Sequence, residues 1–504
     1  MPDAPGESLS RTPPHVPDRP DPKRRLVLSA CLIATFMAAV ESSIVATIIP
    51  TIVGDLGGFN LFTWVFTVYL LTQAVTIPVY GRLADLYGRK PVFFAGTALF
   101  LAATILCGLA WNMPALVVFR ALQGCGAGAI QPTAATILGD IYTPAERGRI
   151  QGLVSSVFGI SAVIGPSLGA FLVETMSWRA VFWVNVPIGI AAIVMIGAFL
   201  KEEVSHRQHR IDWAGSLLLL LACVPLLVAL VQSGSLSSTT LAALTATGLI
   251  ALVALYLQER NTPEPMLPLE LWRNRIIVVG SLGNFASGAM MMGICAFLPT
   301  YVQAVMGRSA ITGGLVLGAM SVSWALSSLA TGRIMLRTSY RFGAILGGAS
   351  LVAGCVILTL LDPAYGPLPA AFGSLVIGIG MGICSTVFIV SIQASVPWGQ
   401  RGAATSSSMF MRFVGQSIGA SGCGAILNLT MRTLDPNALH AVERLLDAPT
   451  RQAMPHAELT HLTDVLSRSV QSAYALATTF ALLALLMATR LPARLSPAHH
   501  TPRT

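Results

Sequence analysis

The sequence predicts an all-α protein that crosses a membrane many times, and three observations support this fold class. Mean hydropathy is +0.71, and only 11% of the 504 residues are charged, whereas a soluble protein carries about 25%. Apolar runs of about 20 residues, the length that a helix needs to span a bilayer, recur along the whole chain. They lack the two-residue alternation of a membrane β-barrel, so we expect helices.

Fourteen apolar runs are predicted to be transmembrane helices. Most of the 31 Lys and Arg residues fall in every second connection and near the two ends of the chain. Because basic residues concentrate on the cytoplasmic side, we expect both termini in the cytoplasm, with the bacterial inner membrane as the location. The net charge of +9 then reflects topology and does not imply nucleic-acid binding. The runs begin near Leu26, Leu61, Val92, Pro114, Ile150, Arg179, Trp213, Thr240, Ile276, Gly313, Phe342, Pro369, Gly402 and Val470.

Two parts of the chain repeat each other. The Gly-x-Gly-x-Gly series at 124–128 recurs at 378–382, and Arg147-Gly148 recurs as Arg401-Gly402, in each case 254 residues later. Parallel six-helix repeats are a transporter architecture with the substrate site between the halves. The predicted divisions are a disordered tail (1–25), a six-helix half (26–200), two extra helices (201–275), a second half (276–490) with a long outer loop (431–469), and a tail (491–504).

Several segments of the first 190 residues resemble a known family. GRLADLYGRKP (Gly81–Pro91) resembles the signature loop between helices 2 and 3 of the major facilitator superfamily, and FRALQGCGAGAIQP (Phe119–Pro132) resembles its helix-4 motif. GISAVIGPSLGA (Gly159–Ala170) resembles the helix-5 motif of its antiporters. SWRAVFWVNVPIG (Ser177–Gly189) and VESSIVATIIP (Val40–Pro50) are similar to segments of its fourteen-spanner drug:proton antiporters. The resemblance implies the major facilitator fold, with two extra helices between two six-helix halves.

The loop signature predicts a latch on the cytoplasmic face. Asp85 can complement the positive N-terminus of a helix, and its basic neighbours can pair with carboxylates across this face. The resemblance implies that the cluster holds the two halves together in the outward-open state. The alternative is a basic anchor at the membrane surface. The residues expected in the latch are Gly81, Arg82, Asp85, Gly88, Arg89 and Lys90.

The helix-5 motif allows two interpretations. Glycine and proline at this spacing weaken the helix at one place and let a neighbouring helix approach closely. The resemblance implies a pliable joint that favours exchange over uniport, whereas the spacing alone equally predicts a packing kink. The motif residues are Gly159, Gly165, Pro166 and Gly169.

Two arginines lie within predicted spans. Arg120, in span 4, keeps its proton and must face water or a carboxylate. Glu41 supplies that carboxylate if spans 1 and 4 both line the cavity, as they do in the superfamily; snorkelling to the outer surface is the alternative. Arg412, in span 13, has no acidic residue within its own half's membrane core, so it can face the cavity, contact the first half, bond to carbonyls or snorkel.

Uncharged residues can complete a cavity lining, although each taken singly is more often helix packing. Gln73, Gln131, Asn284 and Trp324 are the candidates in the spans. Met290–Met292 and Phe285 can add an adaptable apolar surface.

Glu41 is the one acidic side chain expected deep in a span. A carboxyl in a low-dielectric cavity favours its protonated form, so Glu41 can load a proton from outside and release it inside, where a cationic substrate favours the ionised form. The structural alternative is a permanent pair with Arg120. We therefore expect a proton-coupled antiporter that exports hydrophobic, cationic drugs or dyes.

Other functions are less well supported. The alternatives are export of one metabolite, lipid, siderophore or antibiotic, a membrane-embedded enzyme, and a receptor that transports nothing. The sequence has neither a convergent nucleophile–base pair nor a phosphate-binding loop, so we expect no enzyme, no cofactor and no ATP-driven pumping. The expected partners are small hydrophobic substrates, protons and membrane lipids, without nucleic acid; a periplasmic adaptor is left open.

Overall fold

The structure is a computed structural model that describes residues 22–56, 62–200, 202, 212–231, 236–262, 269–308, 310–435 and 454–492. All regular elements in these ranges are helices. The α-helices are α1 (Pro22–Leu56), α2 (Phe62–Tyr87), α3 (Arg89–Gly108), α4 (Met113–Ile141), α5 (Pro144–Thr175), α6 (Trp178–Trp183), α7 (Asn185–Phe199), α8 (Trp213–Val231), α9 (Ser238–Asn261), α10 (Arg275–Thr300), α11 (Ala310–Arg337), α12 (Tyr340–Thr359), α13 (Leu368–Ala394), α14 (Arg401–Leu434) and α17 (His456–Arg490). A π-turn, η3 (Tyr301–Val305), extends α10, and η2 (Leu269–Arg273), η4 (Pro363–Tyr365) and η5 (Trp398–Gln400) are short 3₁₀ turns.

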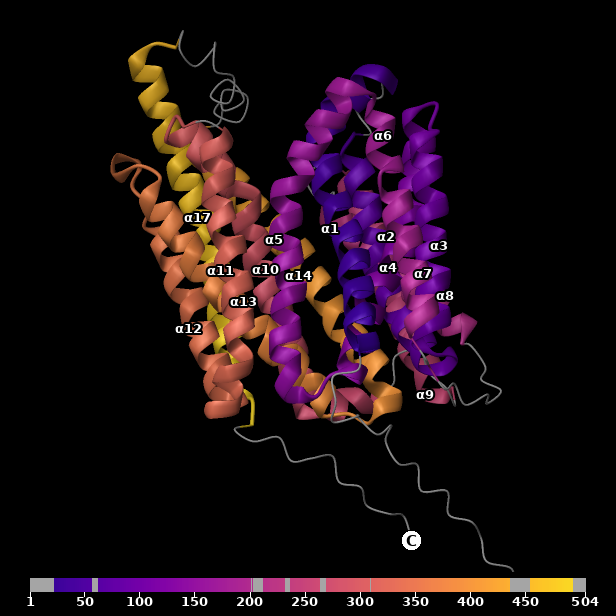
Figure 1. The fold of residues 1–504 in the computed structure, drawn as a ribbon. Coiled ribbons are helices and arrows are strands. Elements are labelled where there is room, and N and C mark those ends of the chain that lie inside the picture. The colour runs from indigo at the N-terminus through magenta and orange to yellow at the C-terminus, as the bar shows by residue number, and fades with distance from the viewer. Residues whose placement is uncertain are drawn as a thin grey trace, which may run out of the picture.

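The helices form two bundles (Figure 1). In one, α1 to α4 pack with α6 and α7; in the other, α10 to α13 pack with α17. Helices α5 and α14 lie between them: α5 packs on α1 and on α11, and α14 packs on α10 and on α2. The α8–α9 pair packs beside α2. The all-helical, two-bundle fold predicted from the sequence is therefore present.

The predicted spans coincide with these helices, and α6 and α7 together form one of them. Nine helical segments of the described ranges are long and apolar enough to cross a membrane. They are α3, α4, the α6–α7 pair, α9, α10 with η3, α11, α12, α13 and α17. The total of fourteen spans stays a prediction.

Two predicted boundaries differ from the structure. Helix α1 begins at Pro22, inside the expected tail, because Arg24 bonds to Glu146 Oε2 at 3.0 Å and its guanidinium stacks on Tyr142. The outer loop expected over 431–469 is shorter, since α14 continues to Leu434 and α17 begins at His456. The helix expected to begin at Asp435-Pro436 lies outside the described residues.

The repeated glycines have the same packing role in both bundles. A Cβ added to Gly124 would lie 2.3 Å from Tyr69 O on α2, and one added to Gly378 would lie 2.2 Å from Met320 O on α11. The middle glycine of each series faces α3 in one bundle and α12 in the other. These close approaches tolerate glycine alone, so the sequence repeat records a repeat of helix packing.

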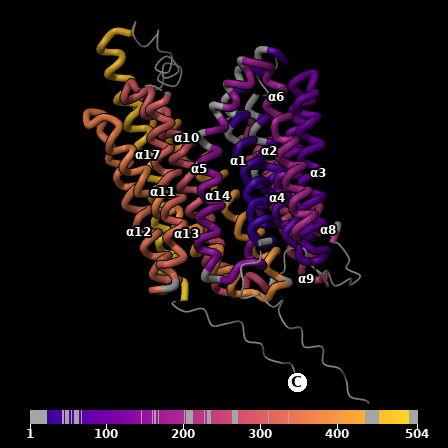
Figure 2. Tube along the Cα trace, viewed as in Figure 1, coloured from indigo at the N-terminus to yellow at the C-terminus, as the bar shows by residue number. Residues whose placement is uncertain are grey.

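The bundles meet at the end that the charge bias assigns to the cytoplasm, called the cytoplasmic end below. A Cβ added to Gly148 on α5 would lie 2.3 Å from Gly332 Cα on α11, and one added to Gly81 on α2 would lie 2.9 Å from Gly402 O on α14. Figure 2 shows the two bundles drawn together at its lower end and apart at its upper end. The described bundles are thus closed against each other on the predicted cytoplasmic side.

Candidate functional site

A charge pair is enclosed within the first bundle. Arg120 Nη1 on α4 lies 2.5 Å from Glu41 Oε1 on α1, and both side chains are 0% exposed. Arg120 Nε also donates to Val65 O on α2 at 3.1 Å. Since neither charge reaches solvent, each is stabilised by the other and by the hydrogen bonds around them. The structure thus brings together the two residues that the sequence analysis pairs.

Three uncharged residues complete this enclosure. Asn185, at the start of α7, donates to Glu41 Oε2 at 2.5 Å. Gln123 Oε1 accepts from Arg120 Nη1 at 2.6 Å, and the Tyr69 ring lies 4.2 Å from the Arg120 guanidinium carbon. The sequence analysis missed all three. Gln123 follows Arg120 by three positions and so lies on the same helix face. Asn185 is a polar residue within the apolar run 178–199. Either feature could have indicated from the sequence a partner of the buried charges.

The pair lies nearer the outer side and away from the space between the bundles. Arg120 is seven residues from the outer end of α4, which is about 10 Å. Neither Glu41 nor Arg120 lines the central cavity described below. Helices α1 and α4 both line that cavity, through Thr35 and Gln131. In this conformation, however, the Glu41–Arg120 pair points into its own bundle.

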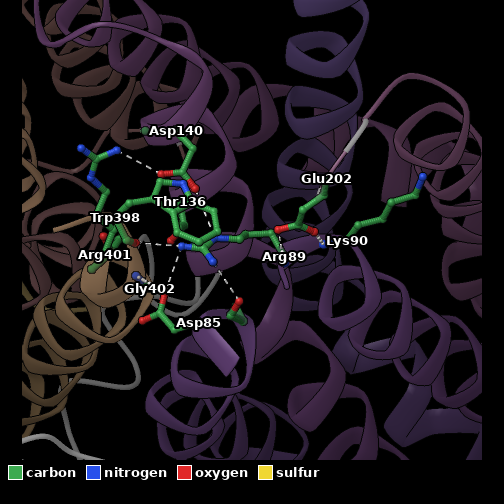
Figure 3. Close-up of polar contacts among 12 residues, drawn as sticks. Asp85, Arg89, Lys90, Thr136, Asp140, Glu202, Trp398, Arg401 and Gly402 are labelled. Carbon is green, nitrogen blue, oxygen red and sulfur yellow. Dashed lines mark hydrogen bonds and ion pairs between the residues drawn. The ribbon is translucent and has the colours of Figure 1, made fainter. Parts of the chain in front are cut away.

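The predicted latch region joins the two bundles at the cytoplasmic end (Figure 3). Asp85 Oδ1 accepts from Gly402 N at 3.0 Å and Oδ2 from Ala403 N at 2.7 Å, so its carboxylate lies at the N-terminus of α14. Arg89 Nη2 donates to Asp85 Oδ1 at 3.1 Å and to Trp398 O of the second bundle at 3.0 Å. A carboxylate at a helix N-terminus meets both free N–H groups and the positive end of the helix dipole.

Further residues, which the sequence analysis did not place in the latch, take part in it. Asp140 accepts from Arg89 Nε at 3.2 Å and from Arg401 Nη1 of the second bundle at 3.2 Å. The Arg89 guanidinium carbon lies 3.9 Å from the centre of the Trp398 ring. Asp140 is thus shared between the bundles, a role that only the approach of α4 to α14 reveals.

Two basic residues expected to pair across the face do not do so. Lys90 Nζ donates to Gly197 O and Leu200 O at the end of α7, within its own bundle. The backbone N–H groups of Lys90 and Arg89 donate to the Glu202 carboxylate at 2.8 and 2.7 Å. Glu202 thereby caps the N-terminus of α3. The Arg82 side chain has no ion pair or hydrogen bond among the described residues, and its Nε is buried.

The two latch glycines have different reasons for being glycine. Gly88, between α2 and α3, has φ = 96°, a conformation that L side chains rarely adopt. Gly81 has a helical backbone, but a Cβ there would lie 1.9 Å from Ser406 Oγ on α14. Gly88 is needed for the turn and Gly81 for the contact between bundles.

The helix-5 motif lies on an unbroken helix. Helix α5 is continuous from Pro144 to Thr175 through Pro166, with Gly165 and Gly169 buried and Gly159 also within it. Helix α5 packs on α1 of one bundle and on α11 of the other. The motif therefore lies on a helix that touches both bundles, whereas its role as a joint stays a prediction.

A cavity between the bundles contains three of the five candidate lining residues. Gln131, Asn284 and Arg412 line it, and Asn284 Nδ2 donates to Ser408 Oγ at 2.7 Å. Gln73 and Trp324 do not line it: Gln73 is 3% exposed, and Trp324 packs against the core of the second bundle. Both side chains are thus covered by neighbouring helices and not by the cavity, which hydropathy alone did not reveal.

Known proteins resemble this chain along most of its length. The Major Facilitator Superfamily profile matches residues 31–420. A protein named "Multidrug transporter protein MdtP" from Bacillus subtilis (strain 168) is 35% identical over 409 residues, which are 81% of this chain and 76% of that protein. "Multidrug resistance protein 3" of the same strain is 31% identical over 471 residues, covering 90% of this chain and 92% of that protein.

A solved structure agrees at the level of the fold. The crystal structure of the human organic anion transporter MFSD10 (TETRAN) superposes with a TM-score of 0.63, covering 93% of this chain and 100% of that one, at 13% identity. At that identity the likeness concerns the fold alone. The fold, the profile match and the two bacterial relatives agree, and the chain is a multi-pass membrane transporter that belongs to the Major Facilitator Superfamily.

Proposed function

We propose that the protein exports small hydrophobic molecules in exchange for protons, and that the Glu41–Arg120 pair is the proton site. The observation that carries the proposal is the enclosure of this pair, with both side chains 0% exposed. The relatives named as multidrug proteins support drug-like cargo. An ionisable pair inside a membrane segment is costly, and such pairs mark ion or proton pathways in transporters.

The position of Glu41 suits a proton site. Among the described carboxylates it alone lies far from both ends of its helix. Protonation would cancel its attraction to Arg120, whereas Arg120 would keep its bonds to Val65 O and Gln123. One proton therefore changes which helices hold each other: the link from α1 to α4 weakens and the link from α4 to α2 persists.

The latch contacts define the conformation that is closed at the cytoplasmic end, and transport requires a second conformation in which they are broken. Asp85, Arg89, Asp140 and Arg401 join the bundles at the cytoplasmic end, so in the predicted orientation this conformation faces outward. Transport then requires these contacts to open while the outer ends of the bundles close. Alternating access about a site between two bundles follows from such an exchange of contacts.

Proton exchange is tested in everted membrane vesicles that are energised to an acidic interior and contain a pH dye. Wild type, Glu41→Gln and the control Asp464→Asn, which alters a half-exposed carboxylate on α17, receive the same panel of lipophilic cations, neutral drugs and lipophilic acids. We expect some compound to collapse the gradient in wild type and in the control but not in Glu41→Gln. Equal collapse in Glu41→Gln would make the pair structural and refute the proton site.

Export of one dedicated product is the second candidate function, and the charge in the cavity lining favours it over multidrug export. Arg412 is the one charged side chain among the described lining residues, and a fixed charge selects more narrowly than an adaptable apolar surface. The same panel separates the two functions. Response to many unrelated compounds indicates multidrug export, whereas response to one chemical class alone indicates a dedicated exporter.

A further inference from the structure

The central cavity lies between the bundles, in the part of its helices that is nearer the cytoplasmic end. Arg412 is eleven residues from the cytoplasmic end of α14, and Asn284 is nine residues from that of α10, which correspond to about 16 and 14 Å. Both side chains therefore lie about three turns inside their helices and line the cavity. Of the positions that the sequence left open for Arg412, the structure shows the one that faces the cavity.

Arg412 has no counter-charge. Among the described residues its side chain makes no ion pair or hydrogen bond, and its buried Nε lacks a partner. Its nearest aromatic ring, Phe413, lies 5.7 Å from the guanidinium carbon. The backbone at Arg412 is held firmly, since a Cβ added to Gly288 on α10 would lie 2.4 Å from Arg412 O. A fixed backbone thus presents a permanently charged group to the cavity.

The described carboxylates cannot supply the missing charge in this conformation. The sequence has no acidic residue between Glu270 and Asp362 or between Asp362 and Asp435, so the second bundle offers none at this depth. In the first bundle Glu41 is enclosed with Arg120, and Asp140 is held by Arg89 and Arg401 at the cytoplasmic end. Charges inside membrane segments pair with one another or with backbone carbonyls, or face a water-filled cavity on a substrate pathway. Arg412 faces the cavity without a described partner, so a ligand bound there can supply the anion.

The rest of the lining suits an amphiphile. Polar groups in the lining come from Gln131, Gln151 and Ser385, and apolar surface comes from Val154, Phe158 and Met409. Phe158 stands 254 residues before Arg412, at the repeat spacing, so equivalent positions of the two bundles offer an aromatic ring and a guanidinium to the same cavity. One end of a ligand can meet the charge while its apolar body meets the ring and the thioether.

We propose that the cavity binds amphiphilic organic acids, with an ionised carboxylate on the Arg412 guanidinium and the apolar body toward Phe158. This names a substrate class for the proposed exporter and rests on that function. It replaces the cationic substrate expected from the sequence, because that expectation assumed that Glu41 lines the cavity. The membrane potential, negative inside, favours the outward movement of an anion by about 2.3 kcal/mol per charge and 100 mV.

Three fluorescent probes that share one apolar body test the proposal. Dansylglycine carries a carboxylate, dansylamide is neutral and dansylcadaverine carries an ammonium group. Binding to the purified full-length protein in nanodiscs is measured for wild type, Arg412→Gln, Arg412→Lys and the control Arg432→Gln, which alters an exposed arginine on the same helix. We expect wild type and the control to bind dansylglycine at least tenfold more tightly than dansylamide. Arg412→Gln should bind the two equally, and Arg412→Lys should retain part of the preference.

Each outcome has one meaning. The proposal is overturned if wild type lacks the preference for the carboxylate, including the case in which no probe binds, or if folded Arg412→Gln keeps the preference. Folding is checked by thermal unfolding of each variant, and Arg412→Lys preserves the charge if the glutamine variant fails to fold. Proton exchange in vesicles is measured separately. A preference for the carboxylate without substrate-driven proton movement would support the binding site and contradict the proposed function. Proton movement driven by cations alone would support the proposed function and contradict the binding site.

Discussion

The two arginines placed within predicted spans are held in opposite ways. Arg120 is enclosed, with a carboxylate, a backbone carbonyl, an amide and an aromatic ring around it. Arg412 reaches a cavity between the bundles and has no such partner among the described residues. The contrast teaches that two arginines in membrane segments of one protein can be accommodated differently, one by an internal counter-ion and the other by facing a cavity.

The largest expected effect comes from breaking the enclosed pair. Arg120→Met leaves the Glu41 carboxylate buried without its counter-charge, and breaking a buried pair typically costs about 3–5 kcal/mol. We expect a lower unfolding temperature in detergent, with much of the loss recovered in the double variant Glu41→Gln/Arg120→Met, which removes both charges. A single variant as stable as wild type would show that the pair does not hold the bundle together.

The next effect concerns the contact between the bundles. Asp85→Asn weakens the bonds to Gly402 N and Ala403 N; bonds to charged groups are worth about 1.5–3 kcal/mol. We expect the population open at the cytoplasmic end to rise by roughly ten- to a hundredfold. Spin labels at the exposed Tyr87 and Phe342, one on each bundle, report the change by double electron–electron resonance. An unchanged distance distribution contradicts a latch at Asp85.

A smaller effect distinguishes a cap within one bundle from a latch between two. Glu202→Gln removes the charge that accepts from Arg89 N and Lys90 N at the start of α3, and a charge at a helix terminus is worth about 0.3–1 kcal/mol. We expect a small loss of thermal stability without a change in the spin-label distances. A shift like that of Asp85→Asn would mean that Glu202 also takes part in closure.

The smallest expected effect is the change in stability when Arg412, the arginine that faces the cavity, is replaced. Arg412→Met removes a cation that has no described partner, so the free energy of unfolding should stay within about 1 kcal/mol of wild type. Unfolding under the conditions used for Arg120→Met provides the comparison. If the two variants lose equal stability, Arg412 has a structural partner and the contrast between the arginines fails.

Features carried along one stretch of chain were predictable. Helices follow from apolar runs, and the repeated glycines at 124–128 and 378–382 indicated two related bundles. The pair of Glu41 and Arg120 was also predictable, because a buried arginine needs an anion and the membrane core offers few. Asp85 was expected at a helix N-terminus, and it lies at that of α14.

Features set by the rotation of one helix against another were not predictable. The sequence could not show that Glu41 faces Asn185 and not the central cavity, nor that Arg412 does face it. Lys90 bonds to α7 and Asp140 joins the bundles because of which helix ends meet. These contacts join residues far apart along the chain, and periodicity within one helix carries no information about them.

The central claim is that proton coupling and substrate charge are handled at separate sites, and one double comparison tests it directly. Proteoliposomes containing wild type, Glu41→Gln or Arg412→Gln receive dansylglycine or dansylamide, and both probe binding and proton movement are recorded. We predict that Glu41→Gln keeps the carboxylate preference but moves no protons, and that Arg412→Gln loses the preference but still moves protons with dansylamide. If either substitution removes both properties together, Glu41 and Arg412 serve one site and the account is contradicted.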